Sequence, residues 1–232
     1  MKIGGLQKTT LVDYPGKIAC TIFLSGCNFR CPFCYSKELV LPEEIEQHPE
    51  IREKELFDFL KQRKGMIDAC VLCGGEPTIN PDIGRFIKKI KDLGYSIKID
   101  TNGYYPDKLK ELIDAKLIDY IAMDVKACFR DYSKATGVNI DIDKIKQSIE
   151  LIKNSGIDYE FRTTIVPNIH TKETIIEMAN DIGKAKKYFL QTFRKDKETI
   201  SRSFNNAKPF PEEELREIIK EISPLFENVK IR

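Results

Sequence analysis

The chain has 232 residues, of which 41% are hydrophobic, so it is long enough to bury the core of one sizeable domain and short for two. Its 38 basic and 36 acidic residues are mixed along the chain and give a net charge of +2, which provides no case for nucleic acid or an anionic membrane as a partner. The N-terminus shows no signal-peptide core, and no apolar run reaches the roughly 18 residues of a membrane span. We therefore expect a soluble, cytoplasmic protein of one domain.

The first predicted elements surround an apolar run at residues 18–24, which is typical of a buried strand. The turn sequence that begins at Asp13 predicts a short strand or hairpin within residues 1–17. A cysteine-containing loop then continues to about residue 40. Residues 41–50 contain two prolines and many acids, which indicates a surface connection, and a helix is expected near 52–63.

From residue 68 onward, short apolar runs alternate with segments whose apolar residues have helical spacing. Strands are predicted at 68–72, 96–100, 119–125, 158–166 and 188–192. Helices are predicted from an Asn80 cap and Pro81 to Gly94, after Pro106, from Ile142 to Gly156, at 172–182 after a Thr171 cap, and at 211–222 after a polar loop near 194–210. Residues 229–231 suggest a final strand.

Strands that alternate with amphipathic helices predict an α/β fold, a parallel sheet with helices outside. There are six such units, so we expect a partial (β/α)6 TIM-like barrel rather than a complete eightfold one. The expected single domain covers 1–232, with an N-terminal extension at 1–17, a barrel core at 18–192 and a C-terminal loop, helix and strand at 193–232.

Three cysteines with C-x₃-C-x₂-C spacing follow the first predicted core strand, namely Cys27, Cys31 and Cys34. Three thiolates in eight residues can converge on one soft metal centre. A fully protein-ligated iron–sulfur cubane has four thiolates, and no fourth cysteine is near, so one coordination position is left for another ligand. The alternative is a zinc site, which would need a fourth cysteine or histidine.

Four further cysteines lie outside this motif. Seven cysteines in a reducing compartment indicate metal binding or catalysis rather than a disulfide framework. We expect Cys20 and Cys70 to be small buried residues. Cys70 and Cys73 are three positions apart, so a regular strand would point them to opposite faces.

The unusual polar groups each come just after a predicted strand. In parallel β/α folds that edge of the sheet carries the functional site, so segments distant in sequence would meet at one mouth. This convergence is stronger evidence for a site than any one of the motifs. The polar groups that follow the strands are Cys27 to Cys34, Gly74 to Glu76, Asp100 to Asn102, Asp124 with Lys126, Arg162, and Gln191.

Each later motif also has a purely structural interpretation. Gly74-Gly75-Glu76 could be a tight turn before a helix, and the segment from Asp100 could be an Asx turn. Asp124 and Lys126 share a face of a strand end and could form a rim salt bridge.

Arg162 could bind a carboxylate of a ligand bidentately, or neutralise Asp124 or Glu160. Of the two histidines, His48 is expected at the surface, and His170 lies after a strand, where it could approach the mouth.

The sequence Gly-Cys-Asn-Phe-Arg-Cys-Pro-Phe-Cys at 26–34 resembles the signature of the radical S-adenosylmethionine (SAM) enzymes. This motif is most similar to that of the glycyl-radical-enzyme activating enzymes, such as the activators of anaerobic ribonucleotide reductase and of pyruvate formate-lyase. The resemblance covers most of the chain. It implies a [4Fe-4S] cluster held by the three cysteines, with SAM on the fourth iron through its amino and carboxylate groups.

The resemblance also implies which residues contact SAM. Gly-Gly-Glu would cradle the amino group, Asp-Val-Lys would hold the carboxylate or ribose, and Asp100, Thr101 and Asp124 would hold a monovalent cation. Two positions depart from several relatives, because Tyr35 and Gln191 stand where those have histidine. The complete expected SAM set is Phe33, Tyr35, Gly74, Gly75, Glu76, Asn102, Asp124, Val125, Lys126, Arg162 and Gln191.

The activity implied by the resemblance is reductive cleavage of SAM to methionine and a 5′-deoxyadenosyl radical, which abstracts hydrogen from a glycine of a partner enzyme. Its protein partners would be a glycyl-radical enzyme and a one-electron donor such as flavodoxin or ferredoxin. Two alternatives stay open at this point. One is a small-molecule radical SAM enzyme similar to 7-carboxy-7-deazaguanine synthase, and the other is a non-catalytic zinc or electron-transfer Fe–S protein.

Overall fold

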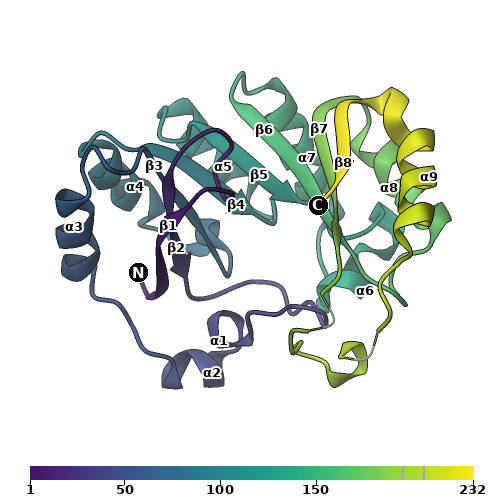
Figure 1. Cartoon of the computed structure of the whole chain (residues 1–232), viewed down its shortest axis with the longest axis horizontal. Coiled ribbons are helices and arrows are strands. Elements are labelled where there is room, and N and C mark those ends of the chain that lie inside the picture. Colours follow the sequence, from purple (N-terminus) through teal and green to yellow (C-terminus); the bar gives the residue numbers. More distant parts are fainter. Residues whose placement is uncertain (195, 206) are drawn as a thin grey trace.

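A curved sheet of eight strands, in chain order from β1 to β8, organises the molecule (Figure 1). The computed structural model describes residues 1–194, 196–205 and 207–232. β2 to β8 run parallel to one another, and β1 pairs antiparallel with β2 at one end of the sheet. The strands are β1 Ile3–Thr10, β2 Ala19–Leu24, β3 Ala69–Gly74, β4 Ser96–Thr101, β5 Tyr120–Asp124, β6 Asp158–Ile165, β7 Ala185–Thr192 and β8 Phe226–Ile231.

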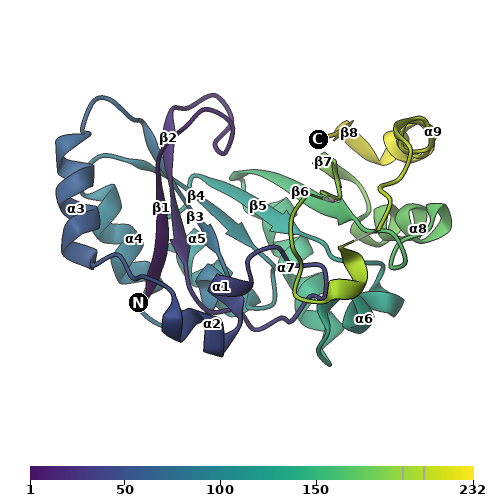
Figure 2. The same ribbon diagram turned by 60° about the horizontal axis from the view of Figure 1, so that its bottom comes forward.

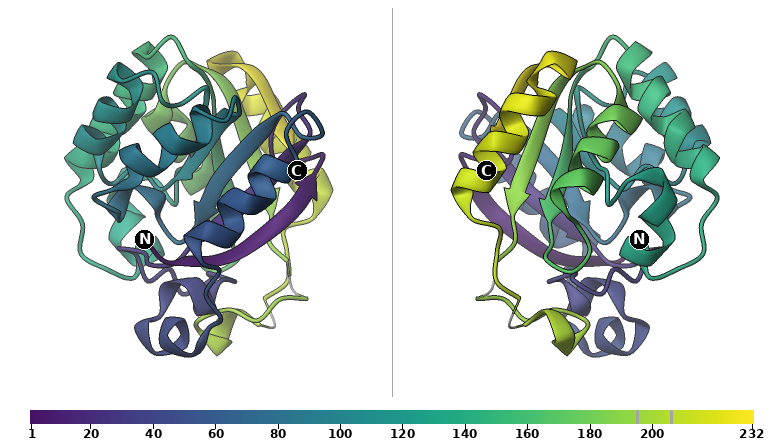
Figure 3. Two further views of the ribbon diagram at one scale, coloured as in Figure 1. Left: turned by 90° about the vertical axis from the view of Figure 1, so that its left-hand side faces the viewer. Right: turned by 90° about the vertical axis from the view of Figure 1, so that its right-hand side faces the viewer.

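The longer helices connect the parallel strands and cover the outer face of the sheet (Figures 2 and 3). Their apolar stripes pack against the alternate strand residues that point outward, so the main core lies between the sheet and the helices. The helices are α1 Lys37–Val40, α2 Pro42–Gln47, α3 Glu53–Gln62, α4 Ile83–Lys91, α5 Pro106–Asp114, α6 Tyr132–Thr136, α7 Ile142–Asn154, α8 Lys172–Ile182 and α9 Glu212–Ile222. The predicted partial barrel with outer helices is confirmed. In the part of the chain that the structure describes, no helix combines the length and the apolar character needed to cross a membrane.

β3 shows how the strand alternation separates the core from the inner face. Cys70 is fully buried on the helix side, and its Sγ lies 3.5 Å from Sγ of Cys20 in the neighbouring strand. Cys73 lines a cavity on the inner face instead. The two thiols therefore point to opposite faces, as the period of a strand requires.

Several boundaries differ from the sequence expectations. Residues 42–47, expected within a surface connection, form α2, which begins at a proline. The helix expected from Asn80 begins instead at Ile83 with Asp82 as its cap residue, because residues 77–79 form a separate 3₁₀ turn. The Thr171 cap is confirmed, since its side chain accepts a hydrogen bond from the backbone N–H of Thr174.

The ends of the sheet are longer than expected. β7 begins at Ala185 rather than at residue 188, and β8 covers six residues where only 229–231 were expected.

Residues 132–136 form α6, which was not expected at all. α6 ends at Gly137, whose φ of +68° lies in the left-handed region that favours glycine.

Candidate active site

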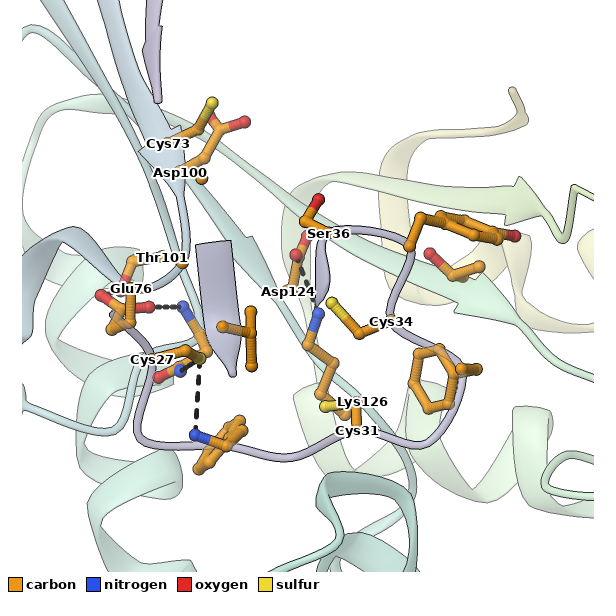
Figure 4. A pocket seen from close by; sticks show the side chains of 18 of the residues that line it. Cys27, Cys31, Cys34, Ser36, Cys73, Glu76, Asp100, Thr101, Asp124 and Lys126 are labelled. Atoms are coloured by element: carbon orange, nitrogen blue, oxygen red, sulfur yellow. Dashed lines mark hydrogen bonds and ion pairs between the residues drawn. The ribbon is translucent and has the colours of Figure 1, made fainter. Parts of the chain in front are cut away.

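A cavity of about 290 Å³ lies at the carboxyl ends of the parallel strands (Figure 4). Its size is at the lower end of small-molecule sites. The loops after β2, β3, β4, β5 and the end of β6 all contribute to it, so the predicted convergence of strand ends is present in the structure. Of the predicted residues, those that line it are Cys27, Cys31, Phe33, Cys34, Tyr35, Gly74, Gly75, Glu76, Asp100, Thr101, Asn102, Asp124, Lys126 and Arg162.

The three cysteines of the motif line this one cavity. Burial raises the pKa of Cys27 to about 11 and that of Cys31 to about 12, and it also raises the pKa of Cys34. Positive charge on Lys126 acts in the opposite direction at all three thiols. In the absence of metal the thiols are therefore protonated, and binding of iron would displace their protons.

The loop that carries the cysteines, residues 26–35, is fixed by close backbone contacts. The amide of Glu76 donates to the carbonyl of Gly26 at 2.7 Å. A Cβ added to Gly75 would lie 1.9 Å from that same carbonyl oxygen, so only glycine allows this approach. Arg30 donates from Nη1 to the carbonyls of Cys27 and Phe29, at 2.7 and 2.8 Å. The position of the cysteine loop thus depends directly on the Gly-Gly-Glu segment.

The carboxylate of Glu76 joins the ends of β3 and β4. Its Oε1 accepts from Thr101 Oγ1 at 2.7 Å and from the backbone and hydroxyl of Thr78, and its Oε2 accepts from the amide of Asn102 at 2.6 Å. A carboxylate has about four acceptor positions, so Oε2 can still take a further donor such as an ammonium group. Asn102 also donates from Nδ2 to Oδ1 of Asn28 at 2.9 Å, which ties the cysteine loop to β4.

A chain of alternating charges crosses the inner face of β4, β5 and β6. Asp100 accepts from Lys98 Nζ on Oδ1 and from Arg162 Nη1 on Oδ2, at 2.5 and 2.9 Å. Asp124 accepts from Arg162 Nε on Oδ1 and from Lys126 Nζ on Oδ2, at 2.9 and 3.0 Å. All four carboxylate oxygens therefore already have a cationic partner from the protein.

This charge chain fixes the ionisation of its members. Burial alone would raise the pKa of Asp124, but Arg162 and Lys126 outweigh it and hold that pKa at about 2. Burial alone would lower the pKa of Lys126, but Asp124 and then Cys31 keep it above its ordinary value. Both groups stay charged near neutral pH, and Lys126 presents an ammonium group beside the thiols.

The fit of a monovalent cation to the predicted set is poor. Asp100 and Asp124 are satisfied by lysine and arginine, and the hydroxyl of Thr101 donates to Glu76 and accepts from the amide of Gly103. A cation would have to displace these partners. We therefore derive no role for such an ion.

The Asp124–Lys126 segment leaves the sheet, so its carbonyls need other partners. Side chains provide them: the Tyr132 hydroxyl lies 3.5 Å from the carbonyl of Asp124, and Thr163 Oγ1 donates to Val125 at 2.8 Å. His170 Nδ1 accepts from the amide of Val166 at 2.8 Å, so its Nε2–H donates to the carbonyl of Lys126 at 2.9 Å.

Burial lowers the pKa of His170, in agreement with a neutral imidazole. The ring of His170 does not line the cavity, and its contact with the site is the hydrogen bond to the carbonyl of Lys126.

Some predicted residues lie elsewhere. The side chain of Val125 is fully buried in the core, and Gln191 is half-buried on β7; neither lines the cavity. His48 is half-buried rather than at the surface, and its Nε2 lies 2.7 Å from the carbonyl oxygen of Gly4. Residues that the sequence did not single out also line the cavity, namely Phe23, Phe29, Ser36, Val40, Cys73 and Thr164.

The segment after β7, of which the structure describes residues 193–194 and 196–205, lies against the cysteine loop (Figure 2), and we call these residues the strap. The amides of Ile200 and Ser201 donate to the carbonyls of Cys34 and Pro32, at 3.0 and 2.8 Å. The amide of Arg194 donates to the hydroxyl of Tyr35 at 2.6 Å.

Two ring contacts reinforce these bonds. Tyr35 stacks on Phe193 with ring centroids 5.5 Å apart, and Phe33 meets Phe204 edge-on at 6.5 Å. Nothing in the local sequence pattern pointed to this contact.

The donor set fits an iron–sulfur cluster better than a single metal ion. Within the described residues, no group of three or more His, Cys, Asp or Glu side chains could hold one ion. Zinc would need its ligands in one shell at about 2.0–2.3 Å, whereas each thiolate of a cluster binds a different iron. Cys73 lines the same cavity but lies beside Asp100, apart from the three motif cysteines (Figure 4), so three soft thiols are left to match a cluster with an open iron.

The sequence profile described as Radical SAM superfamily matches residues 21–182 of this chain. The chain therefore belongs to the radical SAM superfamily, and this membership implies a [4Fe-4S] cluster and SAM as its cofactors. The alternative of a non-catalytic zinc or electron-transfer Fe–S protein is therefore wrong, because the members of this family are enzymes.

Individual proteins add detail to this membership. A Methanocaldococcus jannaschii protein with the name putative glycyl-radical enzyme activating enzyme is 35% identical over 238 residues, which cover 99% of this chain and 95% of that protein. Streptococcus suis SuiB bound to S-adenosylmethionine has a TM-score of 0.66 at 16% identity; the match covers 91% of this chain and only 51% of SuiB. A domain of pyruvate-formate lyase-activating enzyme from Bacteroides vulgatus has a TM-score of 0.57 at 15% identity, over 71% of this chain and 99% of that domain. At these identities the two structures show a shared fold.

Proposed function

We propose that this chain activates a glycyl-radical enzyme by abstracting hydrogen from one of its glycines. The observation that carries the proposal is the 35% identity to the M. jannaschii relative, because it extends over nearly the full length of both chains. The cofactors of the reaction would be a [4Fe-4S] cluster on Cys27, Cys31 and Cys34 and a SAM molecule beside it. When bound, this pair supplies a one-electron cleavage of the sulfonium that yields methionine and a 5′-deoxyadenosyl radical.

The contribution of the protein is to bind and orient SAM. The backbone of Gly74 and Gly75 and the free acceptor position on Oε2 of Glu76 suit its ammonium group. Lys126 is held above its ordinary pKa beside the thiols, so it suits the carboxylate. The aromatic rings of Phe29 and Phe33, both buried, exclude water from one side of the cavity.

The inner face below the cavity is already filled, which supports a substrate that enters from the open side. Tyr14 and Tyr120 pack with ring centroids 5.7 Å apart. Glu160 accepts from the hydroxyl of Tyr120 and from Arg232 Nη1, each at 2.9 Å. Tyr120 is four positions from Asp124 and Glu160 is two positions from Arg162, so each pair points to the same inner face, because side chains alternate along a strand. A glycine on a protruding loop of a protein would not need the space that these side chains take.

Anaerobic reconstitution with iron and sulfide, followed by dithionite and SAM, tests the first half of the proposal. We expect 5′-deoxyadenosine to form with the wild-type chain and not with Cys31→Ala. If that variant retained cleavage, the cluster assignment would be wrong.

The second half of the proposal is tested by adding a candidate glycyl-radical enzyme and recording its EPR spectrum. A glycyl doublet on that enzyme supports the proposal. Cleavage without any doublet, over the glycyl-radical enzymes of the same organism, would instead favour a small-molecule substrate such as a deazaguanine precursor.

A further inference from the structure

Two cysteines outside the cluster motif lie together in the core. Cys20 on β2 and Cys70 on β3 are direct partners in the parallel pairing of these strands. Both residues are fully buried, and their Sγ atoms are 3.5 Å apart. Neither residue lines the cavity, so the proposed function leaves this pair of thiols without a role.

The geometry of the pair suits a disulfide that has not yet formed. Neighbouring strands of a sheet are about 4.8 Å apart. A disulfide joins residues whose Cα atoms are about 4.4–6.8 Å apart, so the paired strands already provide a suitable spacing. The two sulfurs would have to approach from 3.5 Å to a bond length of about 2.05 Å, a change that rotations of the two side chains can provide.

The position of the pair gives such a bond a structural consequence. Cys20 and Cys70 each lie four residues before the last residue of their strand. β2 leads into the cysteine loop, and β3 leads into the Gly-Gly-Glu segment that fixes this loop. Because residues 21–69 lie between the two cysteines, a bond between them would enclose the whole cysteine loop in a covalent ring.

We propose that Cys20 and Cys70 are a site of reversible oxidative modification, at which hydrogen peroxide forms a disulfide that joins β2 to β3. The inference goes beyond the proposed function and does not depend on it. Peroxide oxidises one thiol to a sulfenic acid and leaves as water. The second thiol then attacks that sulfur, the S–S bond forms and a second water leaves. In sum, two thiols lose two electrons and two protons, and one peroxide becomes two waters.

The reaction should be slow in the folded protein. The contact with Cys20, together with burial, raises the pKa of Cys70 well above its ordinary value, and the thiolate is the reactive form. Peroxide therefore reaches a reactive thiol only when the layer of helices outside the sheet opens locally. Once one thiol has reacted, its partner is already in contact, so the disulfide forms before oxidation can proceed to a sulfinic acid.

The test uses the full chain, which is first reduced, then treated with hydrogen peroxide and digested with trypsin. Cleavage after lysine and arginine places Cys20 in the peptide of residues 18–30 and Cys70 in the peptide of residues 65–85. We expect mass spectrometry to find these two peptides joined by a disulfide, and to find them separate after treatment with dithiothreitol.

Two variants and an internal standard make this result specific. Each peptide contains one further cysteine, so the Cys27→Ala/Cys73→Ala variant is used to assign the bond, and it should still give the linked peptides. Adding Cys20→Ala to that variant should abolish them. Met66 lies in the second peptide and is 62% exposed, so its conversion to the sulfoxide reports that the dose of peroxide was sufficient.

Thermal unfolding gives a second readout. The disulfide should raise the melting temperature by about 5 °C or more, because a long covalent ring restricts the unfolded chain. Dithiothreitol should reverse this rise, and the same peroxide treatment should give no rise in Cys70→Ala.

Three results would overturn the proposal. They are complete oxidation of Met66 without linked peptides, an equal rise in melting temperature in Cys70→Ala, or a lower melting temperature for the linked protein than for the reduced one. The outcome is independent of the tests of SAM cleavage and of glycyl radical formation.

Discussion

Arg162 on β6 donates from Nε to Oδ1 of Asp124 on β5 at 2.9 Å. The same guanidinium reaches Asp100 on β4 from Nη1, so one side chain joins three strand ends beneath the cavity. The planar fork of arginine suits two carboxylates at once, which a lysine could not bridge in the same way. This arrangement ties the end of β5, where the Asp124–Lys126 segment begins, to β4 and β6, and the orientation of SAM depends on that segment in our proposal.

Replacing Arg162 by Ala should destabilise the fold strongly. Two largely buried carboxylates would lose a partner, and breaking such a pair from one side costs about 3–5 kcal/mol. Urea unfolding at pH 7 measures the loss. Arg216→Ala is the matched control, because its pair with Glu212 on α9 is exposed and should contribute no more than about 1 kcal/mol. If the two variants lost equal stability, the buried network would not have the role described.

The same network predicts a pH dependence. The folded pKa of Asp124, about 2, lies below its ordinary value, so its stabilising contribution is complete above that ordinary value and is lost as pH falls towards 2. Asp124→Asn should therefore reduce the decline of stability between about pH 4 and pH 2. An unchanged decline in this variant would contradict the assignment.

Monovalent cations should have no specific effect on SAM cleavage. The oxygens of Asp100 and Asp124 are already bound by Lys98, Arg162 and Lys126. The initial rate of 5′-deoxyadenosine formation is measured in potassium, sodium and tetramethylammonium salts at equal ionic strength. Equal rates are expected. A requirement for potassium or sodium would mean that the ion displaces Arg162 in the working enzyme.

Gly75→Ala should prevent correct placement of the cysteine loop. The added Cβ would lie 1.9 Å from the carbonyl oxygen of Gly26, a backbone atom that cannot simply move aside. We expect a loss of iron binding on reconstitution and a loss of several kcal/mol of stability, as for other severe steric clashes (about 4–5 kcal/mol).

Gly84→Ala on α4 is the control for that substitution. Its Cβ would meet only ordinary contacts from 3.5 Å outward, and alanine favours a helix, so neutral or slightly increased stability is expected. Normal iron content in Gly75→Ala would contradict the close approach.

His170 should act as a positioning residue for Lys126. Removing its hydrogen bond to the Lys126 carbonyl, in His170→Ala, should raise the KM for SAM about tenfold and change kcat less. His170→Gln retains an N–H donor and should restore part of the affinity. A purely structural role predicts instead that the fraction of folded protein falls while KM stays constant, which binding of SAM to the purified variants distinguishes.

The sequence was sufficient for the order of the strands and of the longer helices between them, though not for α2 and α6, and for the edge of the sheet at which the candidate site lies. Apolar strands and amphipathic helices have different periods, and polar residues directly after parallel strands must gather at one edge. The sequence did not determine which carboxylate pairs with Arg162. Asp124 and Glu160 were both available, and only the structure shows that Glu160 is occupied by Tyr120 and Arg232.

Other features depend on contacts between segments far apart in the chain. The strap meets the cysteine loop across more than 150 residues, and no local period or spacing encodes that contact. Likewise, the cap expected at Asn80 was displaced to Asp82 because residues 77–79 turn around the carboxylate of Glu76. In both cases a tertiary contact, rather than local sequence propensity, determines the structure.

The most direct measurement of the central claim follows a hydrogen atom. A candidate glycyl-radical enzyme is prepared with glycine deuterated at Cα and incubated anaerobically with this chain, SAM and a reductant. We predict that deuterium moves from the glycine into the 5′ position of 5′-deoxyadenosine as the glycyl radical appears. A glycyl radical that forms while the 5′-deoxyadenosine stays free of deuterium would contradict direct abstraction by this enzyme.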